Sequence, residues 1–507
     1  MKREYMILLF IMIVAFVLRS LYIREGAITF TYDQARDAFV AREIINGDLK
    51  ILGPSANSSG LYHGVAYFYF VALAYFLGGG SPINASYLLV IFSLLSILVV
   101  FYFAKNITGK VGVALLASLF SAVSFEFSQY STWLSNPSLA IVTVPALYLS
   151  VWMWTRKQEN KWKFWEVVAG LTLGLSVQAD VFLLYHIVPV VVWLWLNKNK
   201  IKIVQIGRFI ASSLIALSTM ILVELKFGFQ GVKGALALAG GGETMAQGKR
   251  FGDYVLLYLN QLGDIFANNI FPINISYGSL VVFAMVVWLV ISWLKAKTKV
   301  DLRLFLLLFI FSHSLALPFG GDSTPYLGVG IGASVAVLSA VAMVEFSNRN
   351  KILSYTIISV IILANIFAIV TKNNKGQVIF AVQGSKLLRD ELKLVDYTYS
   401  EMNSEPFAIN SLTTPLYFNT LWSYLYSWYG MEKYSYVPTW YGRDQTGAPG
   451  NLLATDKINK ARFFIKETTE FIPFQFVDEA QNEESGTSEL IEELAFNGIV
   501  VQKRILK

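Results

Sequence analysis

Long apolar runs alternate with short polar segments over the first 371 residues of the chain. A helix needs roughly 20 apolar residues to cross the hydrocarbon core of a bilayer, and most of these runs approach that length. We expect about eleven membrane-spanning helices, near residues 5–23, 84–104, 111–127, 138–154, 165–178, 181–196, 208–227, 277–294, 303–319, 325–345 and 353–371. The run at 65–77 is too short to cross, so we expect it to lie in the membrane interface or to enter and return. The pattern predicts a polytopic α-helical membrane protein.

Basic residues gather between the apolar runs. If the 65–77 run does not cross, five basic groups share the side of the N-terminus: Lys105/Lys110, Arg156/Lys157/Lys161/Lys163, Lys198/Lys200/Lys202/Arg208, Lys295/Lys297/Lys299/Arg303 and Arg349/Lys351. The positive-inside rule places such groups in the cytoplasm. The first run follows Met1-Lys2-Arg3 and has no cleavage site behind it, so we expect a retained anchor. We therefore predict a multi-pass protein of the plasma (cytoplasmic) membrane with a cytoplasmic N-terminus and an extracytoplasmic C-terminal domain.

Three regions are left on the outer side by this topology: the loops 24–83 and 228–276, and the tail 372–507. We expect interfacial helices in the first loop. The tail is more polar and carries strand-like runs, RFFIKE and GIVVQKRI, with an amphipathic stretch near 488–496. These features predict two domains, a transmembrane domain of residues 1–371 and a soluble α/β or α+β domain of residues 372–507.

The overall composition narrows the class further. The chain of 507 residues is 55% hydrophobic and 15% charged, which is too apolar for a soluble enzyme. Its formal net charge is +7, but the positive residues lie in the loops between apolar runs, so nucleic acid is not an expected partner and membrane lipids are. The chain has no cysteine, which excludes disulfides, thiol chemistry and cysteine metal sites.

The segment YDQARDAFVARE, residues 32–43, carries the chemistry that we consider catalytic. Thr31 and Gln34 have the spacing of a capping box, which predicts a helix with Asp33 in its first turn. Asp33 and Asp37 are four residues apart and should share one face, while Ala35, Ala38 and Phe39 should lie on the opposite side, as in a helix on a membrane surface. The alternative is an ordinary first-turn acid with a local ion pair between Arg36 and Asp37.

These residues resemble a motif of the GT-C type glycosyltransferases that use polyprenyl-phosphate sugars, in particular the protein O-mannosyltransferase and aminoarabinose transferase group (glycosyltransferase family 39-like). The family opens with one span, an Asp-Glu-Ala-Arg-like motif and an Ala-Arg-Glu helix, and this chain reads Asp33-Gln34-Ala35-Arg36 and Ala41-Arg42-Glu43. The resemblance covers roughly the first 230 residues. It implies a GT-C-like fold with Asp33 as general base and with Arg36, Asp37 and Arg42 close to the substrates.

Two departures from the family pattern affect the site. His63 stands where the family has lysine, in Tyr62-His63-Gly64-Val65-Ala66-Tyr67, and it either binds phosphate or acceptor or is a plain interfacial residue. Asn136 replaces the family's second acid, and either lines the site or caps the helix that Pro137 begins. A divalent cation is then not supported by a second carboxylate, and we name neither a metal ligand nor a cofactor.

Further polar residues of the outer loops are candidates for substrate binding. Glu224 and Lys226 lie in LVELKFGF, which looks like a motif of bacterial members, and the alternative for them is a pair at a helix end. Lys249 and Arg250 lie in a glycine-rich loop, GGGETMAQGKRFGDY, and either hold the donor phosphate or are a solvated pair.

Two functions from different classes remain. The first is an inverting glycosyltransferase of the cell envelope that moves a sugar from a polyprenyl-phosphate donor to a lipid, glycan or protein acceptor outside the membrane, with Asp33 as base. The second is a transporter or a lipid or glycan flippase, for which inverted repeats and charged residues at the midplane of broken helices are typical. The polar residues collect in an outer loop instead, which favours the transferase.

Overall fold

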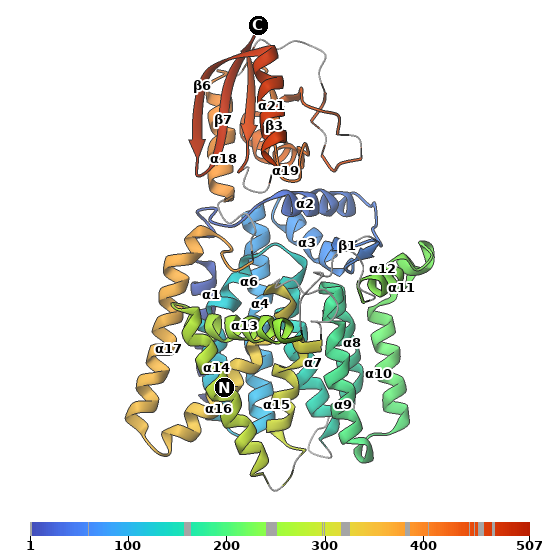
Figure 1. Ribbon diagram of the computed structural model, residues 1–507, viewed down its shortest axis with the longest axis vertical. Coiled ribbons are helices and arrows are strands. Elements are labelled where there is room, and N and C mark those ends of the chain that lie inside the picture. The colour runs from blue at the N-terminus through green and yellow to red at the C-terminus, as the bar shows by residue number, and fades with distance from the viewer. Residues whose placement is uncertain are drawn as a thin grey trace.

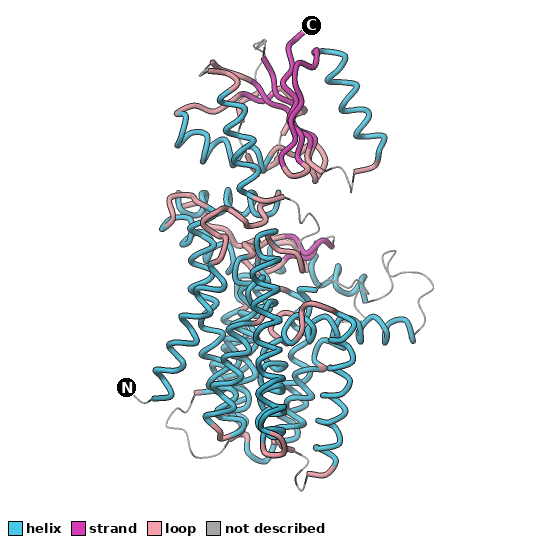
Figure 2. The backbone as a smooth tube through the Cα atoms, turned by 90° about the vertical axis from the view of Figure 1, so that its left-hand side faces the viewer, coloured by secondary structure: helices cyan, strands magenta, loops and turns pink. Residues whose placement is uncertain are grey.

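The computed structural model consists of a helical bundle with a sheet domain on one end (Figures 1 and 2). It describes residues 3–58, 60–156, 164–239, 251–296, 298, 300–315, 325–380, 386–403, 405–445, 447–450, 452–454, 461–468 and 472–507. The bundle is built from the helices α1 (Arg3–Ser20), α4 (Pro82–Thr108), α5 (Val111–Val123), α7 (Ala140–Thr155), α8 (Trp165–Ala179), α9 (Ile187–Leu196), α10 (Ile203–Ala216), α14 (Ile275–Leu294), α15 (Leu302–Ile310), α16 (Gly332–Ser347) and α17 (Lys351–Lys372).

Local signals set the ends of these helices. The longest, α4, begins at Ser81, whose side chain accepts a hydrogen bond from the amide of Asn84, with Pro82 in the first helical position. It ends at Gly109, which has a φ of 70° and can take the left-handed conformation without strain. Both signals are readable in the sequence, so the predicted span near 84–104 is confirmed as one helix.

Other predicted spans are bent or interrupted. By length and composition, three stretches of the described chain can cross a membrane, 82–108, 136–155 and 351–375, or up to five if each of two bent pairs is one span. The predicted span 111–127 bends by 56° between α5 and α6 (Phe125–Thr132), and 208–227 bends by 63° between α10 and α11 (Ser218–Lys226). The total of eleven spans stays a prediction.

A layer of short elements lies between the bundle and the sheet domain (Figure 1). It contains α2 (Tyr32–Ile45), the hairpin of β1 (Ser55–Ser58) and β2 (Leu61–Tyr62), and α3 (Ala66–Leu77). The 12 residues of α3 correspond to the apolar run that is too short to cross. The second predicted outer loop forms α12 (Gln230–Ala239) and α13 (Phe251–Ile270), and α13 lies across the bundle in Figure 1.

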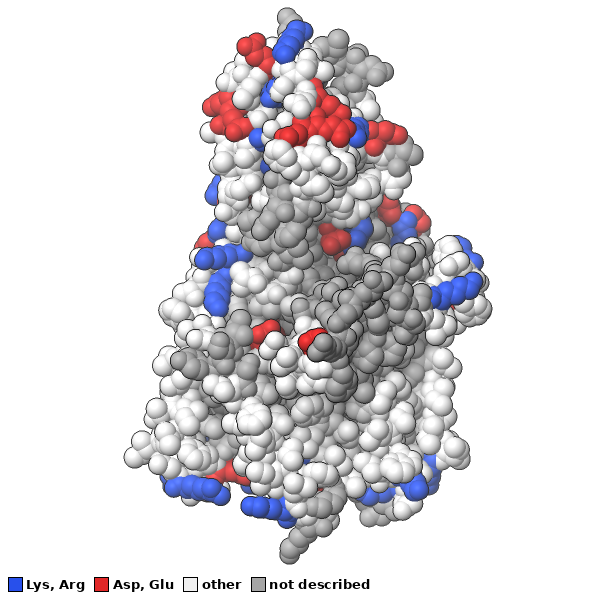
Figure 3. Space-filling view, in the orientation of Figure 1, with Lys and Arg blue, Asp and Glu red and all other residues white. Residues whose placement is uncertain are grey.

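Basic side chains on the visible face of the bundle lie toward its ends. Figure 3 shows lysine and arginine gathered at the end away from the sheet domain, and few charges on the visible face above them. This is the distribution that the basic groups between apolar runs predict. Which end faces the cytoplasm stays a prediction.

The C-terminal domain is a five-stranded mixed sheet with the order β4-β3-β5-β7-β6. Its strands are β3 (Ala408–Leu412), β4 (Thr439–Trp440), β5 (Ala461–Lys466), β6 (Ser488–Phe496) and β7 (Ile499–Leu506). The first three are parallel, and the last two join them in antiparallel pairs. The helix α21 (Phe474–Thr487) lies on one side of the sheet, and α18 (Leu388–Ser400) and α19 (Thr420–Leu425) on the other (Figures 1 and 2). The two strand-like runs are strands, as predicted, and the amphipathic stretch is the strand β6.

Candidate functional site

The helix α2 begins where the sequence predicts it. Thr31 is the N-cap, and Gln34 Oε1 accepts hydrogen bonds from the amide of Thr31 at 3.0 Å and from its hydroxyl at 2.7 Å. Gln34 Nε2 also donates to the carbonyl of Leu134 at 3.2 Å. Gln34, which stands where the family motif has glutamate, therefore both caps α2 and ties it to the segment before Asn136.

Arg36 joins the two aspartates of α2. Its guanidinium donates to Asp33 Oδ1 at 2.7 Å through one nitrogen, and to Asp37 Oδ1 at 2.9 and 2.7 Å through the other two. The side chain of Asp33 is 62% exposed and that of Asp37 only 4%. One cation thus links an accessible carboxylate to a buried one.

The burial of Asp37 corrects the sequence prediction. We expected Asp37 to share one face with Asp33, opposite Ala38. Both aspartates do pair with Arg36, but Asp37 is buried as Ala38 is, because α2 packs against α3 of the same layer and against α19 of the sheet domain. Burial raises the pKa of Asp37 to about 6, and the Arg36 guanidinium acts in the opposite direction. Asp37 consequently changes its protonation close to neutral pH.

His63 and Asp180 form a second buried group beside α2. His63 Nδ1 accepts a hydrogen bond from the amide of Val181 at 3.2 Å and lies 3.6 Å from Asp180 Oδ1. Burial lowers the pKa of His63, with Arg36 contributing in the same direction and Asp180 opposing it. Burial raises the pKa of Asp180, whose Oδ2 has no hydrogen-bond partner in the described part of the chain. His63 directly precedes α3, against which α2 packs, so this buried group lies close to the start of α2.

Asn136 has a structural contact in this arrangement. Its side-chain nitrogen donates to the carbonyl of Ala179 at 2.6 Å, which ties the turn η1 (Asn136–Leu139) to the end of α8 directly before Asp180. The N-cap of η1 is Ser135, so Asn136 does not cap the helix that Pro137 begins. The residue lies next to the site and holds one wall of it.

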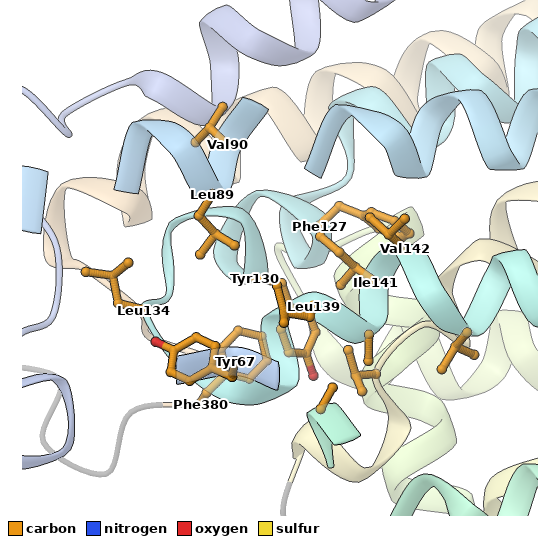
Figure 4. Close-up of a cluster of buried hydrophobic side chains, with 14 of the residues drawn as sticks. Tyr67, Leu89, Val90, Phe127, Tyr130, Leu134, Leu139, Ile141, Val142 and Phe380 are labelled. Carbon is orange, nitrogen blue, oxygen red and sulfur yellow. The ribbon is translucent and has the colours of Figure 1, made fainter. Parts of the chain in front are cut away.

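Tyr67 and Asp180 complete the site, although the sequence did not single out Tyr67 and gave no strong signal for Asp180. Tyr67 is buried, and its hydroxyl has no hydrogen-bond partner among the described residues. Burial raises its pKa well above the usual value, and the nearby Asp37 carboxylate adds to this shift. Figure 4 shows Tyr67 in one cluster with Leu134, Tyr130 and Phe380. An aromatic wall therefore borders the charged group.

Other predicted site residues lie elsewhere. Arg42 stacks on Tyr424 at 4.9 Å from the ring centre and donates to Ser427 Oγ at 3.1 Å, so its contacts are with the sheet domain. Glu224 accepts a hydrogen bond from the amide of Val232 at 3.1 Å, which joins α11 to α12. Lys226 lies 5.6 Å from the ring centre of Phe227, its neighbour in the chain. Lys249 and Arg250 lie outside the described residues.

The site contains no obvious metal centre. In the stretches that the structure describes, no three histidine or carboxylate side chains are grouped so that they could hold an ion. The arrangement offers instead an exposed carboxylate, a fixed guanidinium and a buried carboxylate that fixes it. Such a set can accept a proton and stabilise an anion.

Comparison with known proteins supports the resemblance to GT-C type glycosyltransferases that we drew from the sequence. The family model of dolichyl-phosphate-mannose-protein mannosyltransferases matches residues 62–223. No curated protein matches the chain at a significant level. Among solved structures, ArnT from Cupriavidus metallidurans bound to undecaprenyl phosphate is similar, with a TM-score of 0.59 at 10% identity over 98% of this chain and 97% of that one.

Two further structures extend the comparison. The apo state of the same ArnT gives a TM-score of 0.55 at 10% identity, with 97% of each chain covered. The archaeal oligosaccharyltransferase AglB from Archaeoglobus fulgidus, in complex with an inhibitory peptide and a dolichol-phosphate, gives 0.46 at 12% identity, over 92% of this chain and 70% of that one.

The chain therefore has the ArnT-like GT-C fold with a C-terminal sheet domain, and a membrane location is supported. The resemblance to GT-C type polyprenyl-phosphate-dependent glycosyltransferases that we drew from the sequence is confirmed.

Proposed function

We propose that the protein transfers a sugar from a polyprenyl-phosphate donor to a hydroxyl- or amine-bearing acceptor at the outer face of the membrane. The observation that carries this proposal is the Asp33–Arg36–Asp37 group at the start of α2, next to His63 and Asp180 and on the sheet-domain end of the bundle. The ArnT-like fold and the matching family model support it, because the proteins named there bind undecaprenyl phosphate or are named for dolichyl-phosphate-mannose.

Asp33 acts as the general base in this proposal. The acceptor oxygen or nitrogen forms a bond to C1 of the sugar, the bond from C1 to the phosphate oxygen breaks, and the acceptor proton passes to Asp33. A single displacement of this kind inverts the configuration at C1. Asp33 suits the role because it is the exposed carboxylate of the pair, so an acceptor can reach it.

Arg36 stabilises the departing polyprenyl phosphate. Its guanidinium is held by both carboxylates, so it offers a fixed positive charge where the phosphate anion forms. Asp37 orients the guanidinium from the buried side. The roles predicted from the sequence for two further pairs stay part of the proposal. Lys249 and Arg250 hold the donor phosphate, and Glu224 and Lys226 bind substrate.

Transfer from radiolabelled polyprenyl-phosphate sugars by membranes that contain the protein tests this function. The parent should transfer label to an acceptor, and Asp33→Asn should not, because an amide cannot take the proton. Asp48→Asn is a matched control, since the side chain of Asp48 is 66% exposed in the same outer loop and pairs with Lys50. Equal transfer by the parent and Asp33→Asn would rule out Asp33 as the base, and lipid movement without any transfer would support the flippase alternative.

A further inference from the structure

A cavity of about 220 Å³ lies inside the helical part. It is separate from the group of Asp33, Arg36, Asp37, His63 and Asp180, which we call the α2 site. The cavity is bordered by α6, α13, the turns η4 (Ser312–Leu315) and η6 (Pro325–Gly328), and the segment after α17. One water occupies about 30 Å³, so the cavity has room for a group much larger than one or two waters.

Glu126 is the main ionisable group of this cavity. The break between α5 and α6 at Ser124 places Glu126 against α13, where its Oε2 accepts a hydrogen bond from Asn269 Nδ2 at 2.7 Å. Asn269 is fixed in turn, because its Oδ1 accepts from Ser124 Oγ at 2.7 Å. Glu126 is buried and forms no ion pair with any residue that the structure describes. A buried carboxyl group in an apolar bundle destabilises the fold, so such a residue commonly has a function.

His313 supplies a second polar group to the same cavity. It is buried, and in the described part of the chain neither of its ring nitrogens has a hydrogen-bond partner. Buried polar groups are nearly always paired, so an imidazole with two open positions that lines a cavity indicates a ligand that completes its hydrogen bonds. Asp264 adds a second carboxyl group, and it is exposed at the mouth of the cavity.

The cavity shares a wall with the α2 site. Tyr130 and Phe380 line it, with their ring centres 4.1 Å apart, and Tyr67 of the α2 site belongs to the same cluster (Figure 4). The electrostatic surroundings of Tyr130 include both Glu126 of the cavity and Asp180 of the α2 site. A molecule that fills the cavity therefore ends close to the charged group at α2.

The charge of the lining selects the kind of ligand. Among the described residues that line the cavity, Glu126 and Asp264 are accompanied by one cation, Lys372. Its ammonium already donates to the carbonyl of Pro272 at 2.8 Å and lies over the ring of Phe125. Two carboxyl groups beside one engaged cation disfavour a phosphate. They favour a group that donates hydrogen bonds, such as a hydroxyl or an amine.

We propose that this cavity binds the acceptor substrate through a hydroxyl- or amine-bearing, non-anionic head group. The proposal rests on the proposed function only where it calls the bound molecule the acceptor. The preference of the cavity for such head groups follows from the residues that line it. Glu126 and His313 receive and orient the head group, and Asp264 guides it at the mouth.

Binding of two simple probes to the full-length protein in phosphatidylcholine nanodiscs tests the proposal without any need for turnover. The probes are dodecyl glucoside and dodecyl phosphate, which share a chain and differ in the head group. Glucoside binding by the parent should depend on the cavity, whereas dodecyl phosphate has the Arg36 site available and should respond little to a change at Glu126. Glu126→Gln should weaken glucoside binding about 2- to 10-fold, the range for one lost hydrogen bond.

Two further variants keep the test informative. Asp264→Asn, at an exposed position that tolerates the change, should weaken glucoside binding a few-fold even if Glu126→Gln does not fold. Glu345→Gln removes a matched carboxyl group that lines a different cavity, beside Arg303 and Lys110, and should leave binding as in the parent. Folded variants at Glu126 and Asp264 that bind glucoside like the parent, or that lose dodecyl phosphate as strongly as they lose glucoside, would overturn the proposal.

Transfer assays on the same proteins separate the two ideas. If no preparation transfers sugar but Glu126→Gln loses glucoside binding, the binding role of the cavity is supported and the proposed reaction is wrong. If transfer depends on Asp33 while Glu126→Gln retains both the parent KM for the acceptor and the parent affinity for glucoside, the reaction stands and the cavity proposal fails.

Discussion

The two ends of α2 use arginine in different ways. Near the start of the helix, Arg36 donates to two carboxylates, one exposed and one buried. Near its end, Arg42 contacts no carboxylate that we can identify among the described residues, and lies over Tyr424 and against Ser427 of the sheet domain. The sequence predicts both as substrate-binding residues, yet only Arg36 lies in the charged group.

The difference follows from what covers each end. The start of α2 faces the bundle through Gln34, Asp37 and the segment at Leu134, and stays open at Asp33. The end of α2 is covered by an aromatic group around Tyr424, whose hydroxyl also donates to the carbonyl of Gly80 at 2.6 Å. We infer that the first end performs the chemistry and the second fixes the helix in place.

Of the changes in α2, loss of the proposed general base Asp33 should have the largest effect on turnover. Asp33→Asn should reduce turnover about 10²- to 10⁴-fold, the usual contribution of a general base, with no loss of thermal stability because the side chain is exposed. Turnover and Tm measured on purified protein check this. Retention of most activity would mean that the general base is a residue other than Asp33.

A matched replacement of the two arginines sharpens the comparison. Arg36→Lys keeps the charge but loses the fork that reaches both aspartates, so kcat/KM should fall about 10- to 100-fold. Steady-state kinetics with saturating acceptor and varied donor measure the loss. An activity equal to that of the parent would show that a point charge suffices at this position.

The buried member of the group predicts a pH dependence. Asp37 pairs with Arg36 when ionised, and its pKa is raised to about 6, so activity should fall as pH decreases through 6, about tenfold between pH 7 and 5. Asp37→Asn should lower activity and remove this acid limb. If the limb persists in that variant at the same pH, a different group such as His63 causes it.

The smallest effect belongs to the anchoring end. Arg42→Lys loses the stacked guanidinium over Tyr424 but keeps a cation there, which costs about 0.5–1 kcal/mol at a partly exposed site. Turnover should change less than about fivefold and Tm by about one degree. A loss as large as that of Arg36→Lys would mean that the two ends are not divided as we infer.

Local signals predicted a large part of this structure. The capping pair Thr31 and Gln34, the helix from 32, and the strands at 461–466 and 499–506 follow from spacing and alternation, which depend on neighbouring residues only. The burial of Asp37 and the contacts of Arg42 were not predictable in this way. They depend on α3 and on a domain more than 300 residues further along the chain.

Glu126 was not singled out from the sequence, and the reason is different. An ionisable residue inside a predicted span is itself a sign of function, and the span at 111–127 contained this one. The bend that directs Glu126 toward α13 was less accessible, because Ser124 and Asn269, which hold it, are 145 residues apart. Contacts at such a distance leave no pattern within a single apolar run.

The docking of Tyr424 and Ser427 on α2 has a consequence for how the protein is made. Arg42 and Ser427 are separated by 385 residues, and a ribosome adds about 5–20 residues per second. The helix that carries the base therefore leaves the ribosome about 20–80 s before its anchor exists. We infer that α2 lacks its contacts with Tyr424 and Ser427 until the sheet domain has been synthesised, so a chain that is stopped early carries Asp33 on a helix without this anchor.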